Sequence, residues 1–342
     1  MIDIIIATYN RPTTISNLVS DILKRNITDL NKIIVIDSSD DINGDLIGLD
    51  NVIYQHSNHK NQPYQRYLGY CLAEAEYLLY LDDDMQILDD SVFEKIESIF
   101  SDKNIVGINL KFTNKNEYIN NVKRHSYKKV PSSLVNFLHW ATANPKLPDG
   151  KFWFCGCRGR RMDGGYSEYF SGGAFCARKN DLYRDFNYDI LELFEERIGM
   201  GEDVILAYTL SRQGLIYNLP GSYFFHNDTG NSTYTASNRD YNHRVAYSRM
   251  YLSLEFARLN RRSRVAAIVL TVWHYIWRAA GLYLIALRNS GIGYDGFKGY
   301  LQGIIDSRHL VYRPSVNEYW LDEANNNFKI SPKNQKIADE IK

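Results

Sequence analysis

Short apolar runs alternate with longer segments whose apolar residues recur at helical spacing throughout residues 1–110. The short runs are rich in Ile, Leu, Val and Tyr and are bounded by polar residues, which is typical of buried strands. Between the first two runs, Ile15, Leu18 and Val19 begin an apolar stripe of the kind found on one face of a helix. This alternation predicts an α/β fold with parallel strands. The expected strands span residues 2–7, 32–37, 51–55, 77–81 and 105–110.

The chain has 342 residues, which predicts either two units or one large domain with an appendage. Forty Lys and Arg residues balance forty Asp and Glu residues, so the chain lacks the basic excess with which proteins neutralise nucleic-acid phosphates. We therefore expect no nucleic-acid partner.

Four cysteines are too few and too irregularly spaced for a disulfide framework in a chain of this length, which favours a reducing, cytoplasmic location. Cys155 and Cys157 enclose one glycine but have no matching pair of His or Cys residues nearby in the sequence. Two ordinary thiols are therefore favoured over a zinc site. The N-terminal run lacks a basic leader and is expected to be a buried strand rather than a signal peptide.

Polar residues follow the expected strands at the point where each strand ends. In open α/β sheets, ligands bind beyond the carboxyl ends of the strands, so these residues are candidates for a binding site. They are Thr8, Tyr9, Asn10 and Arg11 after the first strand, Asp37 after the second, His56 after the third, and Asp82, Asp83 and Asp84 after the fourth.

The run of three aspartates, Asp82 to Asp84, stands out among these residues. Carboxylates so close together repel one another unless a cation or hydrogen-bond donors neutralise them. Hard oxygen ligands suit Mg²⁺ or Mn²⁺, which commonly bind through one or two carboxylates together with substrate phosphates. The alternative is a solvated acidic turn that caps the helix expected near Ser91.

The order of these motifs resembles that of the family 2 glycosyltransferases over about the first 230 residues. The resemblance rests on Thr8-Tyr9-Asn10-Arg11-Pro12, Asp37, Arg66 with Gly69, and the three aspartates. It implies a fold of the type called GT-A, a Rossmann-like, mixed but mainly parallel sheet flanked by helices. It also implies a nucleotide-diphospho-sugar donor in its UDP, dTDP or GDP form, held by Mn²⁺ or Mg²⁺.

The resemblance also assigns roles to the residues at the strand ends. Thr8 and Tyr9 would flank the nucleoside, Asp37 would read the base or ribose, and Arg66 would lie near the diphosphate. Asn10, Arg11 and Asp83 would belong to the same nucleotide-sugar site. Asp82 and Asp84 would be the outer carboxylates of the metal motif, with Asp84 as the direct ligand and His226 completing the metal or diphosphate site. A surface or packing role for His226 is the alternative, and Ser38, where many members have an acidic residue or Asn, leaves the base open.

Two later segments resemble the family's acceptor side. Gly172 and Gly173 would lie beneath the acceptor and donor sugars, although a tight turn before a strand fits the same residues. Glu202 and Asp203 match a Glu-Asp motif whose Asp is the catalytic base, with Glu202 orienting the acceptor or supporting Asp203. Acidic residues near a helix N-terminus can also serve only as caps or dipole partners.

The chemistry implied is an inverting transfer of a sugar to a hydroxyl of a glycan or lipid-linked acceptor, in bacterial cell-surface polysaccharide synthesis. A positioned carboxylate would take the proton of the attacking hydroxyl. A nucleotidyltransferase that makes a nucleotide sugar is one alternative, but the Gly-rich loop with a basic residue expected after its first strand is absent. A catalytically inactive glycan- or membrane-binding protein is the other.

The C-terminal third differs in composition from the rest of the chain. We expect a glycosyltransferase domain at 1–232, a basic and helical region at 233–316, and a polar tail at 317–342. Residues 239–264 contain seven Arg and no Lys, and residues 265–287 are apolar except for a stripe at Thr271, His274, Arg278 and Gly281. Such a helix fits the membrane interface, on the cytoplasmic face, better than a membrane span. A helical subdomain packed on the sheet is the alternative.

Overall fold

The computed structural model describes residues 1–25, 27–114, 148–159, 162–227, 237–288 and 294–330. Within these residues nine strands form one sheet, in the order β3-β2-β1-β4-β8-β6-β9-β5, with β7 paired to β9. The strands are β1 (Ile2–Thr8), β2 (Leu30–Asp37), β3 (Val52–His56), β4 (Tyr77–Asp82), β5 (Met85–Ile87), β6 (Ile105–Asn114), β7 (Tyr166–Ser167), β8 (Ala174–Arg178) and β9 (Leu215–His226).

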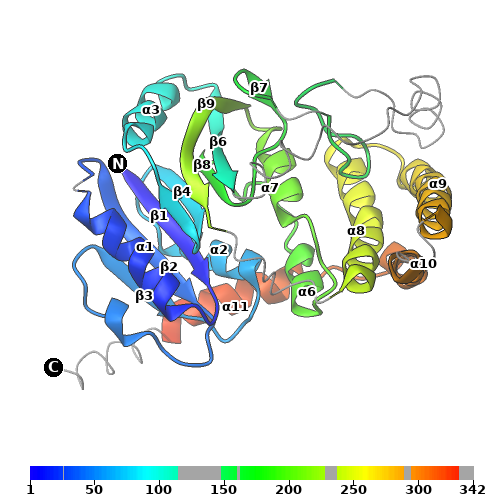
Figure 1. The fold of residues 1–342 in the computed structure, drawn as a ribbon, viewed down its shortest axis with the longest axis horizontal. Helices are drawn as coiled ribbons and strands as arrows, with labels where there is room; N and C mark the ends of the chain where they lie inside the picture. The colour runs from blue at the N-terminus through cyan, green and yellow to red at the C-terminus, as the bar shows by residue number, and fades with distance from the viewer. Residues whose placement is uncertain (26, 115–147, 160–161, 228–236, 289–293, 331–342) are drawn as a thin grey trace.

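The five strands expected from the sequence are all present, and β1 to β4 pair in parallel. The sheet is mixed because β8 runs antiparallel to both β4 and β6, while β6 is parallel to β9. The predicted α/β fold class, a mainly parallel sheet flanked by helices and followed by C-terminal helices, is therefore confirmed (Figure 1).

Helices cover both faces of the sheet. Ile4 of β1 packs in a core cluster with residues of α1 and α3, whereas its neighbour Ile5 belongs to a second cluster with α2, α6 and α7. This split follows from the alternation of side chains along a strand. A Cβ added at Gly69 of α2 would clash with the Ile5 side chain, so glycine allows α2 to lie close to the sheet. These helices are α1 (Pro12–Lys24), α2 (Gln62–Leu72), α3 (Ser91–Phe100), α6 (Asp189–Glu195) and α7 (Glu202–Leu210), and a 3₁₀ turn η1 spans Gly44–Leu46.

The C-terminal helices extend from the α6–α7 side of the domain (Figure 1). They are α8 (Asn238–Leu259), α9 (Arg264–Arg288), α10 (Tyr294–Ser307) and α11 (Asn317–Ile330), with a 3₁₀ turn η3 (Arg308–Val311) before α11. Tyr208 of α7 stacks on Phe256 of α8 with ring centroids 3.9 Å apart, so α8 shares the core of the sheet domain. The expected boundary at residue 232 lies outside the described residues.

The first part of the expected polar tail, residues 317–342, is helical in the structure. Residues 317–330 form α11, and Trp320 is 1% exposed, with its ring 5.2 Å from those of Tyr64 and His59. The Trp320 indole N–H also donates to the Glu192 carboxylate at 3.1 Å. Ala324 is also buried and Leu321 packs on the same core, so α11 is anchored through its apolar side chains. Residues 331–342 lie outside the described part of the chain.

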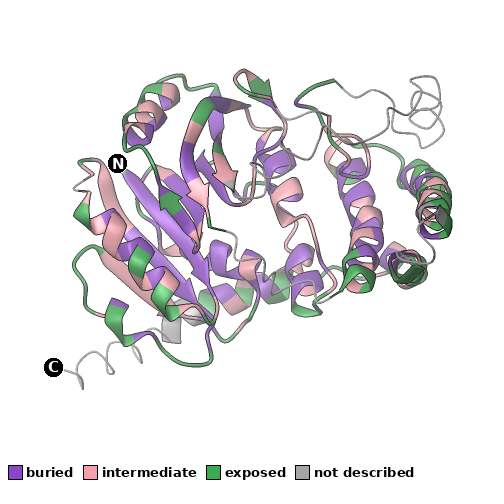
Figure 2. Cartoon of the chain, in the orientation of Figure 1, coloured by how far each residue is buried: buried purple, intermediate pink, exposed green. Residues whose placement is uncertain are grey.

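Helix α9 is buried on one face and exposed on the other (Figure 2), and two of its polar residues lie on the buried face. Thr271 is fully buried, and its hydroxyl donates to Ser253 of α8 at 2.5 Å. Residue His274 is also buried, whereas Arg278 is exposed. The exposed apolar side chains of α9 are Val265, Val269, Leu270, Val272, Trp273, Ile276, Tyr283, Leu284 and Leu287. Residues 264–284 are long and apolar enough to cross a membrane by length and composition alone.

Candidate active site

The strand register brings the expected polar residues to one edge of the sheet. Thr8 lies opposite Asp37, Asp37 opposite His56, and Ala7 opposite Asp82. Because these strands are parallel, their carboxyl ends meet at this edge. The strand ends predicted to carry the site therefore lie side by side.

The three aspartates divide between two groups of partners. Asp83 accepts hydrogen bonds from the Thr8 hydroxyl at 2.7 Å and from Arg11 at 2.8 Å. Arg11 also donates to Asp84 at 3.0 Å. Asp82 instead accepts from Arg66 at 2.9 Å and from the Gln62 amide at 3.1 Å. The alternative of a solvated acidic turn does not fit, since Asp83 is buried and all three carboxylates have basic partners.

His226 joins the aspartates because of a distant strand pairing. The short strand β5 follows the aspartates directly and pairs with the end of β9, with Met85 opposite His226. The His226 ring nitrogen Nε2 lies 2.9 Å from Asp84 Oδ1. Ligand atoms of Asp82, Asp84 and His226 all lie within 4.8 Å of one another. Two carboxylates and an imidazole could together hold a divalent cation.

Burial and neighbouring charges act differently on the three carboxyl groups. Burial raises the pKa of Asp82 and of Asp83, and the cations Arg66 and Arg11 offset only part of that effect. Burial also acts to raise the pKa of Asp84, but hydrogen bonds and charges from His226 and Arg11 outweigh it, and the net shift is downward. Asp84 is therefore the member of the group held most firmly in its ionised, ligand-competent form.

Arg66 connects the aspartates to the start of α7. Its guanidinium is buried and donates to Asp82 and to Glu202, both at 2.9 Å, and to the Gly172 carbonyl at 2.7 Å. Sequence reasoning expected Arg66 near a diphosphate; the structure places it as an ion-pair partner of both acidic motifs. The link to Glu202, 136 residues away, carried no signal in the sequence.

Glu202 and Asp203 form the first turn of α7, after Gly201 in a left-handed conformation with φ of 86°. Burial, and next the nearby Asp203 charge, raise the pKa of Glu202 to about 7, and Arg66 opposes the shift. Asp203 accepts a hydrogen bond from the N–H of its neighbour Val204 at 2.9 Å, whereas the N-cap position of α7 is Gly201, which makes no side-chain cap bond. That contact uses Asp203 Oδ1, and Asp203 Oδ2 faces Gly172.

The two expected glycines lie between the acidic motifs. A Cβ added to Gly172 would lie 3.4 Å from Asp203 Oδ2, and one added to Gly173 would lie 3.1 Å from Asp82 Oδ2. Pairing of β4 with β8 explains the second contact, because Leu81 lies opposite Ala174 and the Asp82 N–H donates to the Gly173 carbonyl at 3.0 Å. Small residues at both positions leave space beside the two carboxylates.

Asp37 is held rigidly by residues that the sequence did not single out. The Tyr54 hydroxyl donates to Asp37 Oδ2 at 2.7 Å, and the Ser39 N–H donates to Oδ1 at 2.8 Å. The Asn10 N–H in turn donates to the Ser39 hydroxyl at 2.7 Å. Close by, the Lys60 ammonium lies 4.9 Å from the centroid of the Tyr9 ring. Tyr54 lies two residues before the end of β3, and nothing in the sequence indicates that it would bind Asp37.

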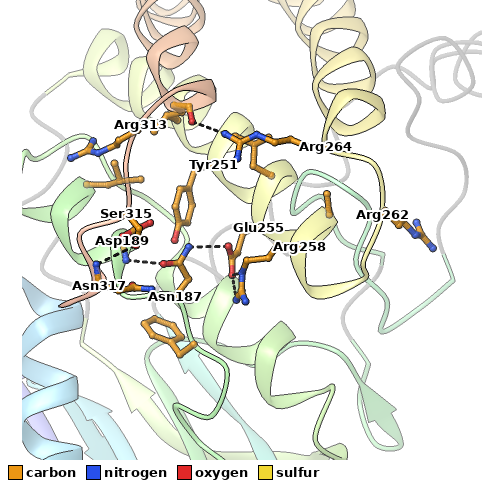
Figure 3. A pocket seen from close by; sticks show the side chains of 15 residues that line it. Asn187, Asp189, Tyr251, Glu255, Arg258, Arg262, Arg264, Arg313, Ser315 and Asn317 are labelled. Carbon is orange, nitrogen blue, oxygen red and sulfur yellow. Dashed lines mark hydrogen bonds and ion pairs between the residues drawn. The ribbon is translucent and has the colours of Figure 1, made fainter. Parts of the chain in front are cut away.

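A separate cavity of about 540 Å³ lies between α6, α8 and the segment before α11 (Figure 3). Its charged residues are largely paired with one another. The Asn187 amide donates to Glu255 at 3.0 Å, Arg258 forms an ion pair with the same carboxylate, and the Ser315 hydroxyl donates to Asp189 at 3.0 Å. None of the residues that line it belongs to the predicted site.

Comparisons with known proteins give one family match and several structural likenesses. Residues 3–162 match the family model described as Glycosyl transferase family 2. Curated protein sequences give no match. Among solved structures, residues 1–349 of TarS from S. aureus are 14% identical with a TM-score of 0.45, covering 90% of this chain and 91% of that one. The same segment of TarS in complex with UDP-GlcNAc is 13% identical with a TM-score of 0.45, covering 90% of this chain and 91% of that one. Mannosyltransferase PcManGT from Pyrobaculum calidifontis, in complex with GDP-Man and Mn²⁺, is 13% identical with a TM-score of 0.43, covering 91% of this chain and 84% of that one.

The family match favours sugar transfer over the nucleotidyltransferase alternative. It covers the polar ends of β1 and β2, the aspartates and Arg66, which are the residues that carry the resemblance in the sequence. Residues 3–162, slightly less than half of the chain, therefore match glycosyl transferase family 2, and this match supports a glycosyltransferase.

Proposed function

We propose that the protein is an inverting, metal-dependent glycosyltransferase that moves a sugar from a nucleotide-diphospho-sugar to a hydroxyl of a glycan or lipid-linked acceptor. The observation that carries the proposal is the bridge made by Arg66, which ties Asp82 of the aspartate group to Glu202, the neighbour of Asp203. On this proposal, the bridge would keep the donor site next to the proton acceptor. The proposed setting is bacterial cell-surface polysaccharide synthesis.

The group Asp82, Asp84 and His226 fits the divalent cation implied by the family. The donor atoms converge within 4.8 Å, and the small Gly173 leaves space beside Asp82. The imidazole favours Mn²⁺ over Mg²⁺, which prefers oxygen ligands. A cation bound there would offset the negative charge that develops on the departing diphosphate.

The residues at the ends of β1 and β2 are proposed to hold the nucleotide. Asp37 is fixed by Tyr54 and Ser39 with its carboxylate at the sheet edge, where it can accept hydrogen bonds from the base or ribose. Thr8, Tyr9 and Asn10 would line the nucleoside, and Arg11, which donates to Asp83 and Asp84, would approach the diphosphate.

Asp203 is proposed to be the catalytic base. The acceptor hydroxyl attacks the anomeric carbon from the face opposite the diphosphate and transfers its proton to Asp203 as the new C–O bond forms. The bond between the anomeric carbon and the diphosphate oxygen breaks in the same displacement, so the anomeric configuration inverts. A positioned carboxylate of this kind contributes about 10² to 10⁴ in rate. Glu202, held by Arg66, would orient the acceptor or support Asp203.

The test combines a screen of nucleotide sugars with two variants. Donor hydrolysis or transfer is measured with UDP, dTDP and GDP sugars in the presence of Mn²⁺ or a chelator. We expect Asp84→Ala to lose Mn²⁺-dependent binding of the nucleoside diphosphate. We expect Asp203→Asn to keep that binding and to lose transfer by about 10² to 10⁴. Transfer by Asp203→Asn at the parental rate would show that the base is another residue.

We further propose that the region from α8 to α10 brings the enzyme to the cytoplasmic face of the membrane as a peripheral protein. The support is the orientation of α9, which buries Thr271 and exposes Trp273 and Ile276. An apolar face with aromatic residues and nearby Arg261 and Arg262, both exposed, suits the interface of an anionic bilayer. Of the expected basic run, Arg244 is instead buried in the fold, where it donates to the Gly199 carbonyl. The division at residue 232 into a sheet domain and this region belongs to the same proposal.

A further inference from the structure

Cys155 and Cys157 lie at the tip of a small hairpin in the segment before β7. Phe152 and Arg158 form an antiparallel bridge, and the Trp153 N–H donates to the Cys157 carbonyl at 2.6 Å. Between the cysteines, Gly156 has a φ of 74°, the left-handed conformation that lets the chain reverse. The hairpin thereby brings the two sulfur atoms to 3.5 Å from each other.

A third metal-ligating group comes from α9. One ring nitrogen of His274 and both cysteine sulfur atoms lie within 4.8 Å of one another. Sequence spacing favoured two ordinary thiols because no partner pair stands nearby in the sequence. The partner is a single histidine more than a hundred residues away, which only the packing of α9 brings to the hairpin.

The separation of the two sulfur atoms is close to the edge of a tetrahedral metal site, and the His274 nitrogen lies within 4.8 Å of both. With Zn–S bonds of about 2.3 Å, two thiolates on one zinc ion lie about 3.8 Å apart. With a Zn–N bond of about 2.0 Å, a sulfur and an imidazole nitrogen lie about 3.5 Å apart. The observed sulfur separation of 3.5 Å is close to the first of these values and far from a disulfide bond of about 2.05 Å.

Residues of α8 and α7 contact the hairpin and hold it in place. Arg249 of α8 donates to the Cys155 carbonyl at 2.7 Å, and Cys155 is fully buried, while Cys157 is partly exposed. A Cβ on Gly156 would meet Leu252 of α8 at 2.6 Å and Val204 at 3.4 Å, so the hairpin tip packs on the first turn of α7. The three ligands therefore come from two separate parts of the fold, the hairpin and α9, and the hairpin is held by α8 and α7.

We propose that Cys155, Cys157 and His274 bind a zinc-type divalent cation that fastens α9 to the hairpin beside α7. Two thiolates and an imidazole select a softer metal than the carboxylates of the catalytic group. Three protein ligands leave the fourth tetrahedral position for water. The metal ties the helix with the exposed apolar face to the segment next to Asp203, so that α9 is held in register with the active site.

The test measures metal content and ligand identity in the full-length protein. Protein purified under reducing conditions is expected to retain about one zinc ion per chain after dialysis. Replacement of that zinc by Co²⁺ is expected to give near-ultraviolet absorption from thiolate-to-cobalt charge transfer, a signal that the carboxylate group cannot produce. Asp84→Ala is expected to leave this signal unchanged.

Cys155→Ser and His274→Gln are expected to weaken zinc binding by more than about 100-fold, because losing a group that merely supports a ligand already costs about 10- to 100-fold. Cys71→Ser is the matched control, since Cys71 is also a free, partly buried cysteine but lies outside the cluster. If a variant fails to fold, the wild type decides: chelation is expected to lower its melting temperature and added Zn²⁺ to restore it.

Three results would overturn the proposal. One is a wild-type protein that takes up no zinc even when it is supplied. Another is zinc retained at full stoichiometry by Cys155→Ser. The third is a Cys155–Cys157 disulfide, detected as a loss of both free thiols in protein isolated without reductant but with thiol trapping.

Discussion

Glu202→Gln should change how the stability of the protein depends on pH. The Glu202 carboxylate is mostly buried, lies next to Asp203 and is bonded to Arg66 at 2.9 Å. Burial first, and the Asp203 charge second, raise its pKa from 4.5 to about 7 against the opposing effect of Arg66. Glutamine has nearly the same size and keeps an oxygen for Arg66, but it does not titrate.

The size and sign of the effect follow from the two pKa values. A rise from 4.5 to about 7 is worth about 3 kcal/mol, since each pKa unit is about 1.4 kcal/mol. Between these pH values the folded protein binds the proton more tightly than the unfolded chain. The contribution of the Glu202 carboxyl to the free energy of unfolding is thus fully present below pH 4.5 and is lost as the pH rises through about 7. The variant has no such loss.

Urea unfolding of both proteins, measured with a chelator from pH 4.5 to about pH 8, tests this reasoning. The free energy of unfolding of Glu202→Gln minus that of the wild type should increase by about 3 kcal/mol across the range. Groups that titrate alike in both proteins cancel in this difference. Glu94→Gln, at an exposed position, supplies the baseline for removing a glutamate. A difference that is flat with pH, or that decreases, would refute the burial argument.

Other changes test separate parts of the structure. Gly172→Ala places a methyl group 3.2 Å from the Asp203 Cβ and should lower kcat about tenfold while leaving donor binding intact. Gly44→Ala is the control, since Gly44 has open space around it, and it should have no effect. A normal kcat for Gly172→Ala would contradict the close packing. Ile276→Glu, on the exposed face of α9, should abolish flotation of the protein with anionic liposomes without lowering its melting temperature. If the wild-type protein floats with neither anionic nor neutral liposomes, the proposed membrane contact is wrong. Trp320→Ala should cost about 3 to 5 kcal/mol in the free energy of unfolding, whereas a loss below about 1 kcal/mol would mean that α11 is not anchored there.

The strands and the edge that carries the site could be predicted because they depend on local pattern and parallel geometry alone. Short apolar runs identified β1, β2 and β4, and polar residues at their ends had to meet at one edge. Thr8, Asp37 and Asp82 therefore lie side by side as expected. The aspartate run is informative for the same reason, because buried carboxylates demand a partner.

The partners themselves could not be predicted because they come from distant pairings. His226 reaches Asp84 only because β9 is long enough to pair with β5. Arg66 reaches Glu202 only because α2 and α7 both meet the sheet edge. Periodicity gave the extent of α9 but not which face would meet α8, since a polar stripe can point inward when hydroxyl groups such as that of Thr271 find partners there.

The Arg66 guanidinium bonds to both acidic motifs, so a change of charge at one of them affects the other. A cation held by Asp82 would share that carboxylate with Arg66 and would leave more of the arginine's charge to Glu202. Ionisation of Glu202 is then easier in the loaded enzyme than in the empty one. Binding at the aspartates would thus favour the charged form of the residue beside Asp203, and a single buried arginine would couple the two acidic motifs.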